Sequence, residues 1–222
     1  MTTILNIDCT GSEAFVAIAK DGILQDVLHN VVQKEHASFL HPALQALLSK
    51  LDIQPNQIDA VAVTNGPGSY TGIRIGLAAA KGLCYTLNLP LICINSLVLL
   101  ASTTKRSTEG KLGVIVPIID ARRMEVFTAV YDTDINELEA PHALLLNSES
   151  FNNYLSKEVV IFCGSAIQKF HTICVHKNAH FVDTTDVSAE MCKLSYLKFN
   201  QSETSDLVLS NPCYVKEFYE FK

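Results

Sequence analysis

The residues best suited to chemistry follow the first apolar run of the chain. Asp8 ends a run that predicts a strand at residues 3–8, and Thr10, Gly11 and Ser12 come directly after it. The amides and hydroxyl groups of such a turn can donate hydrogen bonds to phosphate oxygens, which would suit a nucleotide. The same residues fit a structural role, in which Asp8 accepts hydrogen bonds from the turn. We predict the structural role and keep nucleotide contact as the alternative.

A second aspartate, Asp120, stands in a similar place after another apolar run, and the same two roles fit it. Its turn continues with Ala121, Arg122 and Arg123, which are bulkier than the residues after Asp8. Two neighbouring guanidinium groups could present forked donors to an anionic partner such as RNA or another subunit. They could equally project into solvent from a hairpin turn.

Other candidate sites, for a metal ion or a catalytic nucleophile, find little support in the sequence. His36 and His41 are five residues apart, which puts their rings about 140° apart on a helix, so they cannot share a metal ion. No carboxylate or Cys completes a ligand set beside them. Ser69 and Ser165 lie in turns, but neither belongs to a G-x-S-x-G motif with a predicted base. We therefore predict no metal site and no catalytic nucleophile.

The stretch NGPGSYTGIRIGLAAAKGLCYTL dominates the pattern of the first half. It predicts a tight turn, an N-cap at Ser69 and a helix over residues 70–87. The turn lacks the lysine of a P-loop, so we do not predict a phosphate loop. Small residues recur every four positions, at Gly68, Gly72, Gly76 and Ala80. Since each interior Gly costs a helix about 1 kcal/mol relative to Ala, this ridge predicts close contact with another backbone. The helix is apolar nearly all round, so it is buried on more than one side, within a large core or against another protein.

Composition sets the broad class. The 222 residues are 48% hydrophobic and 18% charged, with a formal net charge of −6. The acidic balance gives no support for extensive direct contact with nucleic acid, which requires clustered Lys and Arg. Seven cysteines are scattered singly, which predicts buried free thiols in a reducing compartment. No signal peptide or spanning segment is recognised, so we expect a cytoplasmic protein without membrane contact.

Strands and helices then alternate. Strands are expected at residues 3–8, 14–19, 23–29, 60–63 and 89–95, with a first helix over 39–51 whose start Pro42 should limit. A helix beginning at Ser96 should fade into a polar loop at residues 103–111, which sets a boundary between domains 1–104 and 105–222. The second half repeats the pattern more loosely, with strands at 143–146, 159–162 and 180–182 and helices at 148–155 and 189–199.

The two halves share a short internal repeat. LNIDCTGSEAFVAIA aligns without gaps with PIIDARRMEVFTAVY, so that Asp8 matches Asp120 and Phe15 matches Phe127. Each copy reads as a strand, an aspartate, a turn and a returning strand. The repeat predicts two similar α/β halves that close over a cleft.

The chain resembles the TsaB (YeaZ) family of bacterial proteins along nearly all its length. The resemblance rests on ILNIDCTG, GPGSYTGIRIGLAAAKGL, DARRMEVFTAVY and PCYVKEFY, of which the second is the most specific. It implies two duplicated actin- and hexokinase-like (ribonuclease-H-like) α/β halves with mixed sheets flanked by helices. Kinases and ATPases of that fold keep a Gly-rich turn where this chain has Arg122 and Arg123, so catalysis on a triphosphate is not expected.

The resemblance also implies a function. Family members form a non-catalytic subunit of the complex that installs threonylcarbamoyl on adenosine 37 of transfer RNA. The catalytic partner is TsaD, a small ATPase called TsaE joins the pair, and transfer RNA is met only through the complex. No intrinsic cofactor is implied, although ATP or ADP could bind in the cleft or at the partner interface. The alternatives are a small-molecule kinase or ATPase and, less favoured, a metalloprotease.

In the family, two helices of the first half form the interface with TsaD, or a homodimer in its absence. They match residues 36–51 and 70–87 of this chain. The residues that the resemblance places at this interface are His36, Phe39, Leu40, Leu44, Tyr70, Ile73, Arg74, Gly76, Leu77, Ala80 and Lys81.

Overall fold

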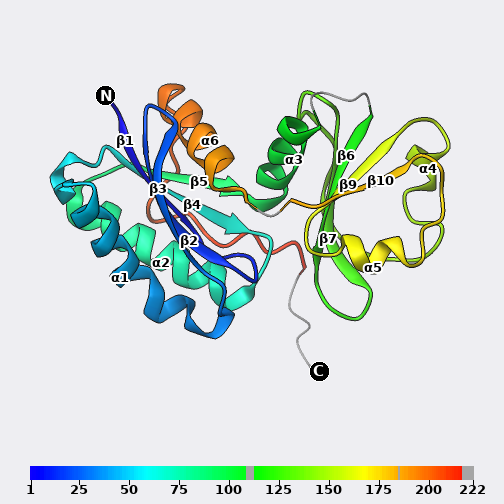
Figure 1. Ribbon diagram of the computed structural model, residues 1–222, viewed down its shortest axis with the longest axis horizontal. Coiled ribbons are helices and arrows are strands. Elements are labelled where there is room, and N and C mark those ends of the chain that lie inside the picture. The colour runs from blue at the N-terminus through cyan, green and yellow to red at the C-terminus, as the bar shows by residue number, and fades with distance from the viewer. Residues whose placement is uncertain (109–112, 185, 217–222) are drawn as a thin grey trace. The chain divides into compact units, whose positions relative to one another are not determined.

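The computed structural model describes residues 1–108, 113–184 and 186–216. These residues form two compact α/β units, each built on its own five-stranded sheet (Figure 1). The first unit comprises Met1–Ser96 and Asp186–Cys213, and the second comprises Leu97–Thr185 and Tyr214–Lys222. None of the described helices is long and apolar enough to cross a membrane.

The first sheet has the strand order β3-β2-β1-β4-β5. Its strands are β1 (Thr3–Asp8), β2 (Ala14–Lys20), β3 (Ile23–Asn30), β4 (Ala60–Gly66) and β5 (Leu91–Asn95). The first three strands run antiparallel as a meander, and β4 and β5 run parallel to β1. Every residue of β1 is buried, because helices cover both faces of the sheet.

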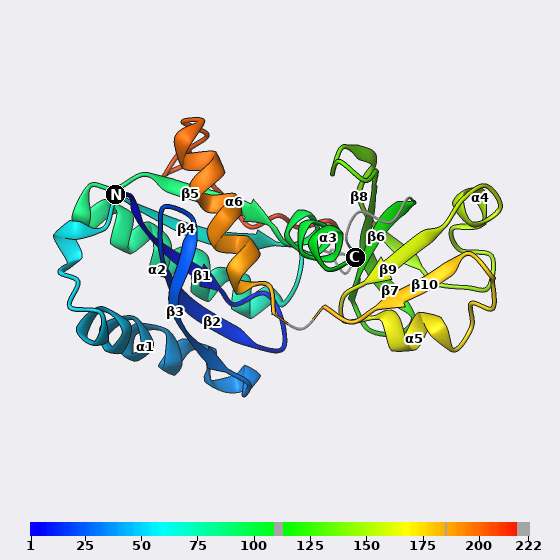
Figure 2. The same ribbon diagram turned by 45° about the horizontal axis from the view of Figure 1, so that its top comes forward.

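Three helices cover the first sheet. α1 (His36–Lys50) packs against β2 and β3, and α2 (Tyr70–Leu87) packs against β1 and β4. α6 (Ser188–Asn200) packs against β1, β3 and β5 from the opposite face, as Figures 1 and 2 show. The main core lies between the sheet and the pair α1 and α2, where Leu5, Ile7 and Val16 meet Leu47 and Leu77.

The second sheet has the order β10-β9-β6-β7-β8. Its strands are β6 (Val114–Asp120), β7 (Glu125–Tyr131), β8 (Glu137–Leu145), β9 (Val160–Cys163) and β10 (Ala179–Val182). One core holds four packed rings, Phe151, Phe162, Phe170 and Phe181. Its helices are α4 (Asn152–Leu155) and α5 (Ile167–His171). α3 (Ser96–Ser107) contributes Leu97 and Ala101 to a separate cluster with Ile115 and Tyr131.

The two sheets repeat one topology, which confirms the predicted duplication. In each, an antiparallel meander of three strands is followed by two strands parallel to the first. The pairing differs by one residue, since Asp8 lies opposite Phe15 whereas Asp120 lies opposite Val126. The ungapped sequence match therefore finds both strands of each hairpin but sets the returning strand one residue out of register, because the second hairpin has the shorter turn.

Several predicted boundaries differ from the structure. The boundary between residues 104 and 105 cuts through α3, whose packing assigns it to the second unit, while α6 belongs to the first. Residues 103–107 are helical rather than a loop, and residues 109–111 of that predicted loop lie outside the described residues. α1 begins at His36, so Pro42 lies inside the helix instead of limiting its start. Pro42 is exposed there, and the predicted helix at 148–155 is reduced to the single turn α4.

Candidate functional site

The turn between β4 and α2 is packed against the turn between β1 and β2. The amide of Ser69 donates to the Thr10 carbonyl oxygen over 2.7 Å, and the Ser69 hydroxyl accepts from the Gly72 amide over 3.3 Å. Ser69 is thus the N-cap that the sequence predicts. A Cβ atom on Gly72 would lie 1.8 Å from the Cys9 carbonyl oxygen, so only Gly fits at this position. The glycines of this turn serve internal packing, in keeping with the prediction that it is no phosphate loop.

The ridge of small residues on α2 faces the protein's own sheet. Gly76 lies over Val63 and Cys9, and Ala80 is fully buried. The prediction of a close backbone is therefore confirmed, but that backbone is Cys9, in the turn after β1. The ridge does not face a partner. Ile73 and Leu77 lie on the same buried side.

The predicted interface residues consequently fall into two groups. Tyr70 and Arg74 are exposed, and Phe39 and Lys81 are partly exposed. The remaining seven are buried in the first unit: His36, Leu40, Leu44, Ile73, Gly76, Leu77 and Ala80. Of these, Leu40 and Leu44 also reach the surface hollows described below.

The exposed side of α2 carries an ordered aromatic and basic stripe. The Arg74 guanidinium lies 3.9 Å from the centre of the Tyr70 ring, a cation–π contact that holds both side chains along the helix. Lys81 donates to the Val208 carbonyl oxygen over 3.2 Å, and Tyr85, one turn further on, is 82% exposed. Because these residues are spaced four or seven apart, they share one face of α2.

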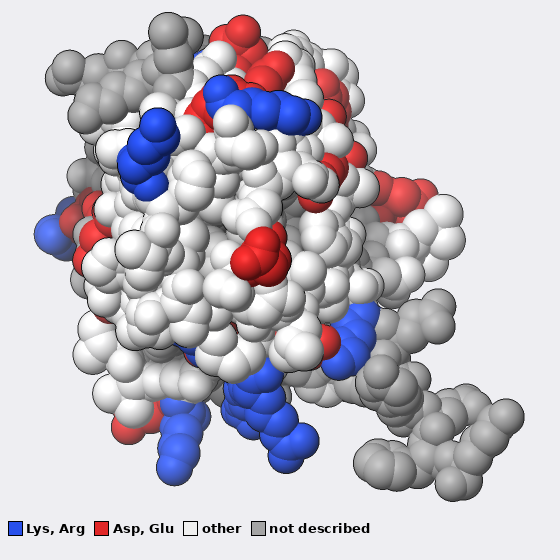
Figure 3. Space-filling view, turned by 90° about the vertical axis from the view of Figure 1, so that its right-hand side faces the viewer, with Lys and Arg blue, Asp and Glu red and all other residues white. Residues whose placement is uncertain are grey.

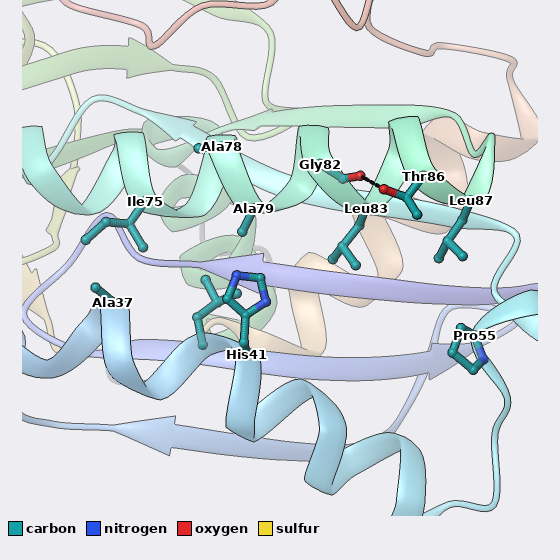
Figure 4. A pocket seen from close by; sticks show the side chains of 11 residues that line it. Ala37, His41, Pro55, Ile75, Ala78, Ala79, Gly82, Leu83, Thr86 and Leu87 are labelled. Atoms are coloured by element: carbon teal, nitrogen blue, oxygen red, sulfur yellow. Dashed lines mark hydrogen bonds between the residues drawn. The ribbon is translucent and has the colours of Figure 1, made fainter.

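An apolar groove runs between α1 and α2 (Figure 4). Its volume is about 650 Å³, and its lining is almost entirely apolar. In Figure 4, Ile75, Ala79 and Leu83 point from α2 toward α1, and His41 points back from α1. Its lining residues are Ala37, Leu40, His41, Pro55, Ile75, Ala78, Ala79, Gly82, Leu83, Thr86 and Leu87. A second hollow of about 330 Å³ shares His41 and Pro55 with it and extends along α1 past Leu44 and Leu48.

The polar side chains that line the groove are few, namely His41 and Thr86. The Thr86 hydroxyl donates to the Gly82 carbonyl oxygen over 2.8 Å, so it offers little to a polar ligand. An open, elongated and apolar surface between two helices is typical of contact with another protein rather than with a small polar molecule. We refer to these residues together as the α1–α2 groove.

His36 has a structural place at the start of α1. Its ring is 1% exposed, with Nδ1 3.2 Å from the Asn30 side-chain nitrogen and Nε2 3.5 Å from the Gly11 carbonyl oxygen. His36 therefore links β3 to the turn after β1. His41 lies apart from it on the exposed side of α1, at the groove. Among the described residues, no group of three or more His, Cys, Asp or Glu side chains could hold a metal ion.

Asp8 is the centre of a buried hydrogen-bond cluster. Its Oδ1 accepts from the Thr10 amide (2.8 Å), the Thr10 hydroxyl (2.7 Å) and the Thr64 hydroxyl (2.6 Å). Asp8 thus caps the turn, as the structural prediction states, and ties it to β4. Gly11 and Ser12 are exposed beyond it. Among the described residues, only Thr10 and Thr64 donate to Asp8, and nucleotide contact at Gly11 and Ser12 stays a prediction.

Asp120 repeats the cap in the second unit. Its Oδ1 accepts from the Arg122 amide over 2.7 Å and pairs with the Lys169 ammonium over 2.5 Å. Partial burial alone would raise the pKa of Asp120, but the bonds from Lys169 and the Arg122 amide outweigh it and hold the pKa below its usual value. Asp120 therefore stays ionised at neutral pH.

The cysteines are free thiols, and five of them are buried. Burial raises the pKa of Cys9 to about 12, with the neighbouring Asp8 carboxylate contributing. Burial has the same effect on Cys163. These thiols are unsuited to nucleophilic chemistry at neutral pH.

Sequence reasoning missed most of the groove. The sequence pattern places Ala78, Ala79 and Leu83 in an apolar helix without assigning them a contact, and it gives His41 no role at an interface. The strand at residues 60–63 indicates which side of the next helix is buried, because a helix that directly follows a strand usually packs against that strand. That rule assigns the small-residue ridge to the sheet and leaves the opposite side of α2 for other contacts.

Comparison with known proteins identifies the family. A sequence model of the family described as TsaD, tRNA N6-adenosine threonylcarbamoyltransferase, matches residues 23–198. The chain is 35% identical over 129 residues to the tRNA threonylcarbamoyladenosine biosynthesis protein TsaB of Bacillus subtilis (strain 168). It is 33% identical over 133 residues to the protein of the same name from Escherichia coli (strain K12). The chain belongs to the TsaB (YeaZ) family. This family is related to TsaD, since the TsaD model spans most of the chain.

The fold agrees with that membership. A crystal structure of a Pseudomonas aeruginosa protein described as similar to peptidase YEAZ superposes with a TM-score of 0.83, at 22% identity, over 97% of this chain and 100% of that one. The sequence matches are shorter. They cover 58% and 60% of this chain, and the chain spans about half the length of these curated TsaB relatives, 55% and 56%.

The stretches that resemble the TsaB family meet in the structure. ILNIDCTG and NGPGSYTG are joined by the bond between Ser69 and Thr10, and the Cys213 amide of PCYVKEFY donates to the Asn65 carbonyl oxygen over 2.7 Å. Residues 217–219 of the last stretch lie outside the described residues.

Proposed function

We propose that this chain is a non-catalytic subunit of a complex that installs threonylcarbamoyl on adenosine 37 of transfer RNA. It would act by docking through the α1–α2 groove to a catalytic subunit of the TsaD family. A TsaE-like ATPase would join the pair, and two copies of the chain would pair through the same groove when the catalytic subunit is absent. The observation that carries the proposal is the open apolar groove in a chain whose relatives are named for threonylcarbamoyladenosine biosynthesis.

The geometry favours docking over catalysis. The polar cluster at Asp8 is buried, and Oδ1 of Asp8 accepts hydrogen bonds from Thr10 and Thr64 of the same chain. The Asp120 carboxylate is likewise engaged by Lys169 and a backbone amide. In contrast, the groove offers apolar side chains from two helices, and α2 also carries the exposed Tyr70 and Arg74 pair outside the groove lining. Tyr and Arg are enriched among residues that anchor protein interfaces.

Two matched substitutions test the docking site. Ala78 is exposed and lines the groove on α2, whereas Ala46 is exposed on α1 and does not line it. Ala78→Arg should raise the Kd for the TsaD-family subunit at least roughly tenfold, because a guanidinium would be buried against apolar surface without a partner. Ala46→Arg should leave the Kd unchanged. Both variants should keep the far-ultraviolet circular dichroism spectrum of the parent chain.

The measurement is a titration of the purified catalytic subunit by calorimetry, followed by reconstituted transfer RNA modification with and without each variant. Equal Kd values for Ala78→Arg and Ala46→Arg would place the docking site elsewhere. Modification of transfer RNA by this chain without the catalytic subunit would refute the non-catalytic role. Steady ATP hydrolysis by the chain alone, abolished by Asp8→Ala, would favour the kinase or ATPase alternative and locate a nucleotide on this chain.

A further inference from the structure

The turn between β6 and β7 has an uncommon backbone. Arg122, Arg123 and Met124 adopt left-handed φ angles of 71°, 47° and 63° in succession. The turn is closed by bonds from Ala121 N to Glu125 O (2.9 Å) and from Glu125 N to Arg122 O (2.8 Å). Residues with side chains avoid this region, and Asn or Gly usually fills it. Three such residues together in one short turn point to a functional requirement for their side chains.

Specific contacts hold the turn in place. Asp120 accepts from the Arg122 amide at one end. At the other end the Met124 carbonyl oxygen accepts from the Leu146 amide over 2.8 Å, and the Met124 side chain packs against the core of the second unit. With Met124 anchored inward, Arg122 and Arg123 are both exposed.

Lysines, rather than the two arginines, form the close ion pairs with the acidic groups around the turn. Asp120 forms its ion pair with Lys169, and both carboxylate oxygens of Glu125 accept from the Lys216 ammonium at 2.8 and 2.9 Å. Each of these two carboxylates is thus paired with a lysine, and the Arg122 charge also acts on Asp120. Within the described part of the chain, neither arginine forms an ion pair. Counting the described residues at this turn, the local charge is therefore positive in a chain whose formal net charge is −6.

The surface of the second unit carries few charges. Figure 3 looks onto this unit and shows a broad area with few charged side chains, with Lys and Arg side chains at the upper and the lower edges of the view. The turn between β6 and β7 lies at the lower end of this unit in Figure 1.

We infer that Arg122 and Arg123 bind the phosphate backbone of an RNA. Guanidinium groups match the oxygens of a phosphate with two parallel hydrogen bonds, and two adjacent groups can span neighbouring phosphates. The turn projects rather than encloses, which suits a repeating polyanion better than a single small anion. The inference rests on the proposed function, because a complex that modifies transfer RNA has such a ligand, and it assigns the contact to this subunit.

The test uses the complex of this chain with its TsaD-family subunit and a transfer RNA transcript that reads codons beginning with adenosine. Arg122→Gln/Arg123→Gln should raise the Kd for the transcript roughly tenfold near 0.1 M salt. It should also reduce the slope of log K against log salt by about 1.4–1.8, as expected for two lost phosphate contacts. The control is Lys157→Gln/Lys177→Gln, which removes the same charge from two exposed positions of the second unit. The control should leave both quantities near wild type.

The outcomes separate the inference from the proposed function. Calorimetry first measures assembly of the complex, which the arginine variant should not change. Unchanged RNA affinity and slope in an assembled complex would overturn the inference and leave the docking proposal intact. An equal loss in the lysine control would overturn it as a net-charge effect. Loss of assembly in the arginine variant would assign the turn to a subunit contact. Displacement of the transcript by millimolar ATP only when both arginines are present would instead assign the turn to a nucleotide.

Discussion

Three glycines of α2 provide a sharp test of how this helix is packed. Gly72, Gly76 and Gly82 are all helical, so the same change to Ala removes the same intrinsic penalty of about 1 kcal/mol at an interior position. Their surroundings differ. A Cβ atom would lie 1.8 Å from the Cys9 carbonyl oxygen at Gly72, 3.5 Å from the nearest Val63 methyl carbon at Gly76, and more than 4 Å from any atom at Gly82.

The expected effects follow from these distances. At Gly72, α2 and the turn after β1 must separate by more than 1 Å, which weakens the bond between Ser69 and Thr10 and opens the core at Cys9. Overpacking costs about 1–3 kcal/mol, and a disturbed hydrogen bond about 1 kcal/mol more. We expect Gly72→Ala to destabilise the protein by about 3 kcal/mol or more. Gly76→Ala fits an ordinary contact, and Gly82→Ala meets open space, so each should stabilise by about 0.5–1 kcal/mol.

Urea and thermal unfolding followed by far-ultraviolet circular dichroism measure the three variants. For a chain of this size, 1 kcal/mol corresponds to about 2–4 °C in Tm. Gly82→Ala should therefore raise Tm by about 1–4 °C, and Gly72→Ala should lower it by about 6–12 °C. A Gly72→Ala protein within about 1 kcal/mol of wild type would refute the close approach of α2 to Cys9. Destabilisation by Gly82→Ala would refute its open surroundings.

Two further predictions concern titratable groups. Burial raises the pKa values of Cys9, Cys163 and Cys192 to about 12, so these thiols should resist iodoacetamide at pH 8 in the folded protein and react in urea. Mass spectrometry counts the labelled thiols. Fast labelling of any of the three in the folded protein would contradict their burial. Asp120, whose pKa is held below its usual value, stabilises the fold above the unfolded pKa near 4, and this contribution is lost as pH falls through the folded pKa. Asp120→Asn should therefore lower the midpoint of urea unfolding at pH 7. The difference in midpoint between this variant and wild type should shrink between about pH 5 and pH 2. A difference that does not change with pH would show that the carboxylate charge has no role.

The local elements could be predicted because their patterns depend on short-range rules. Ser69 is a helix cap, the apolar run at residues 60–63 forms β4, and the aspartate after each first strand caps its turn. The matching hairpins also revealed the duplication, since a repeated pattern specifies a repeated fold.

The remaining features depend on contacts between distant residues. Pro42 normally ends a helix, but in α1 it lies on the exposed side, where the missing hydrogen bond is tolerated. The direction of the small-residue ridge was set by Cys9, more than 60 residues away in sequence from Gly72. The groove exists only because α1 and α2 pack side by side on one sheet, so neither helix alone reveals it.

The discontinuity of the first unit has a consequence for protein synthesis. Its sheet and the pair α1 and α2 are complete once residue 96 has left the ribosome, but α6 begins only at Ser188. At translation rates of about 5–20 residues per second, the sheet face under α6 waits for roughly 5–20 s. That face includes Ile4, which points away from the α1 and α2 side of β1 and is fully buried in the finished fold. The nascent chain therefore carries an uncovered apolar sheet face through most of the synthesis of the second unit.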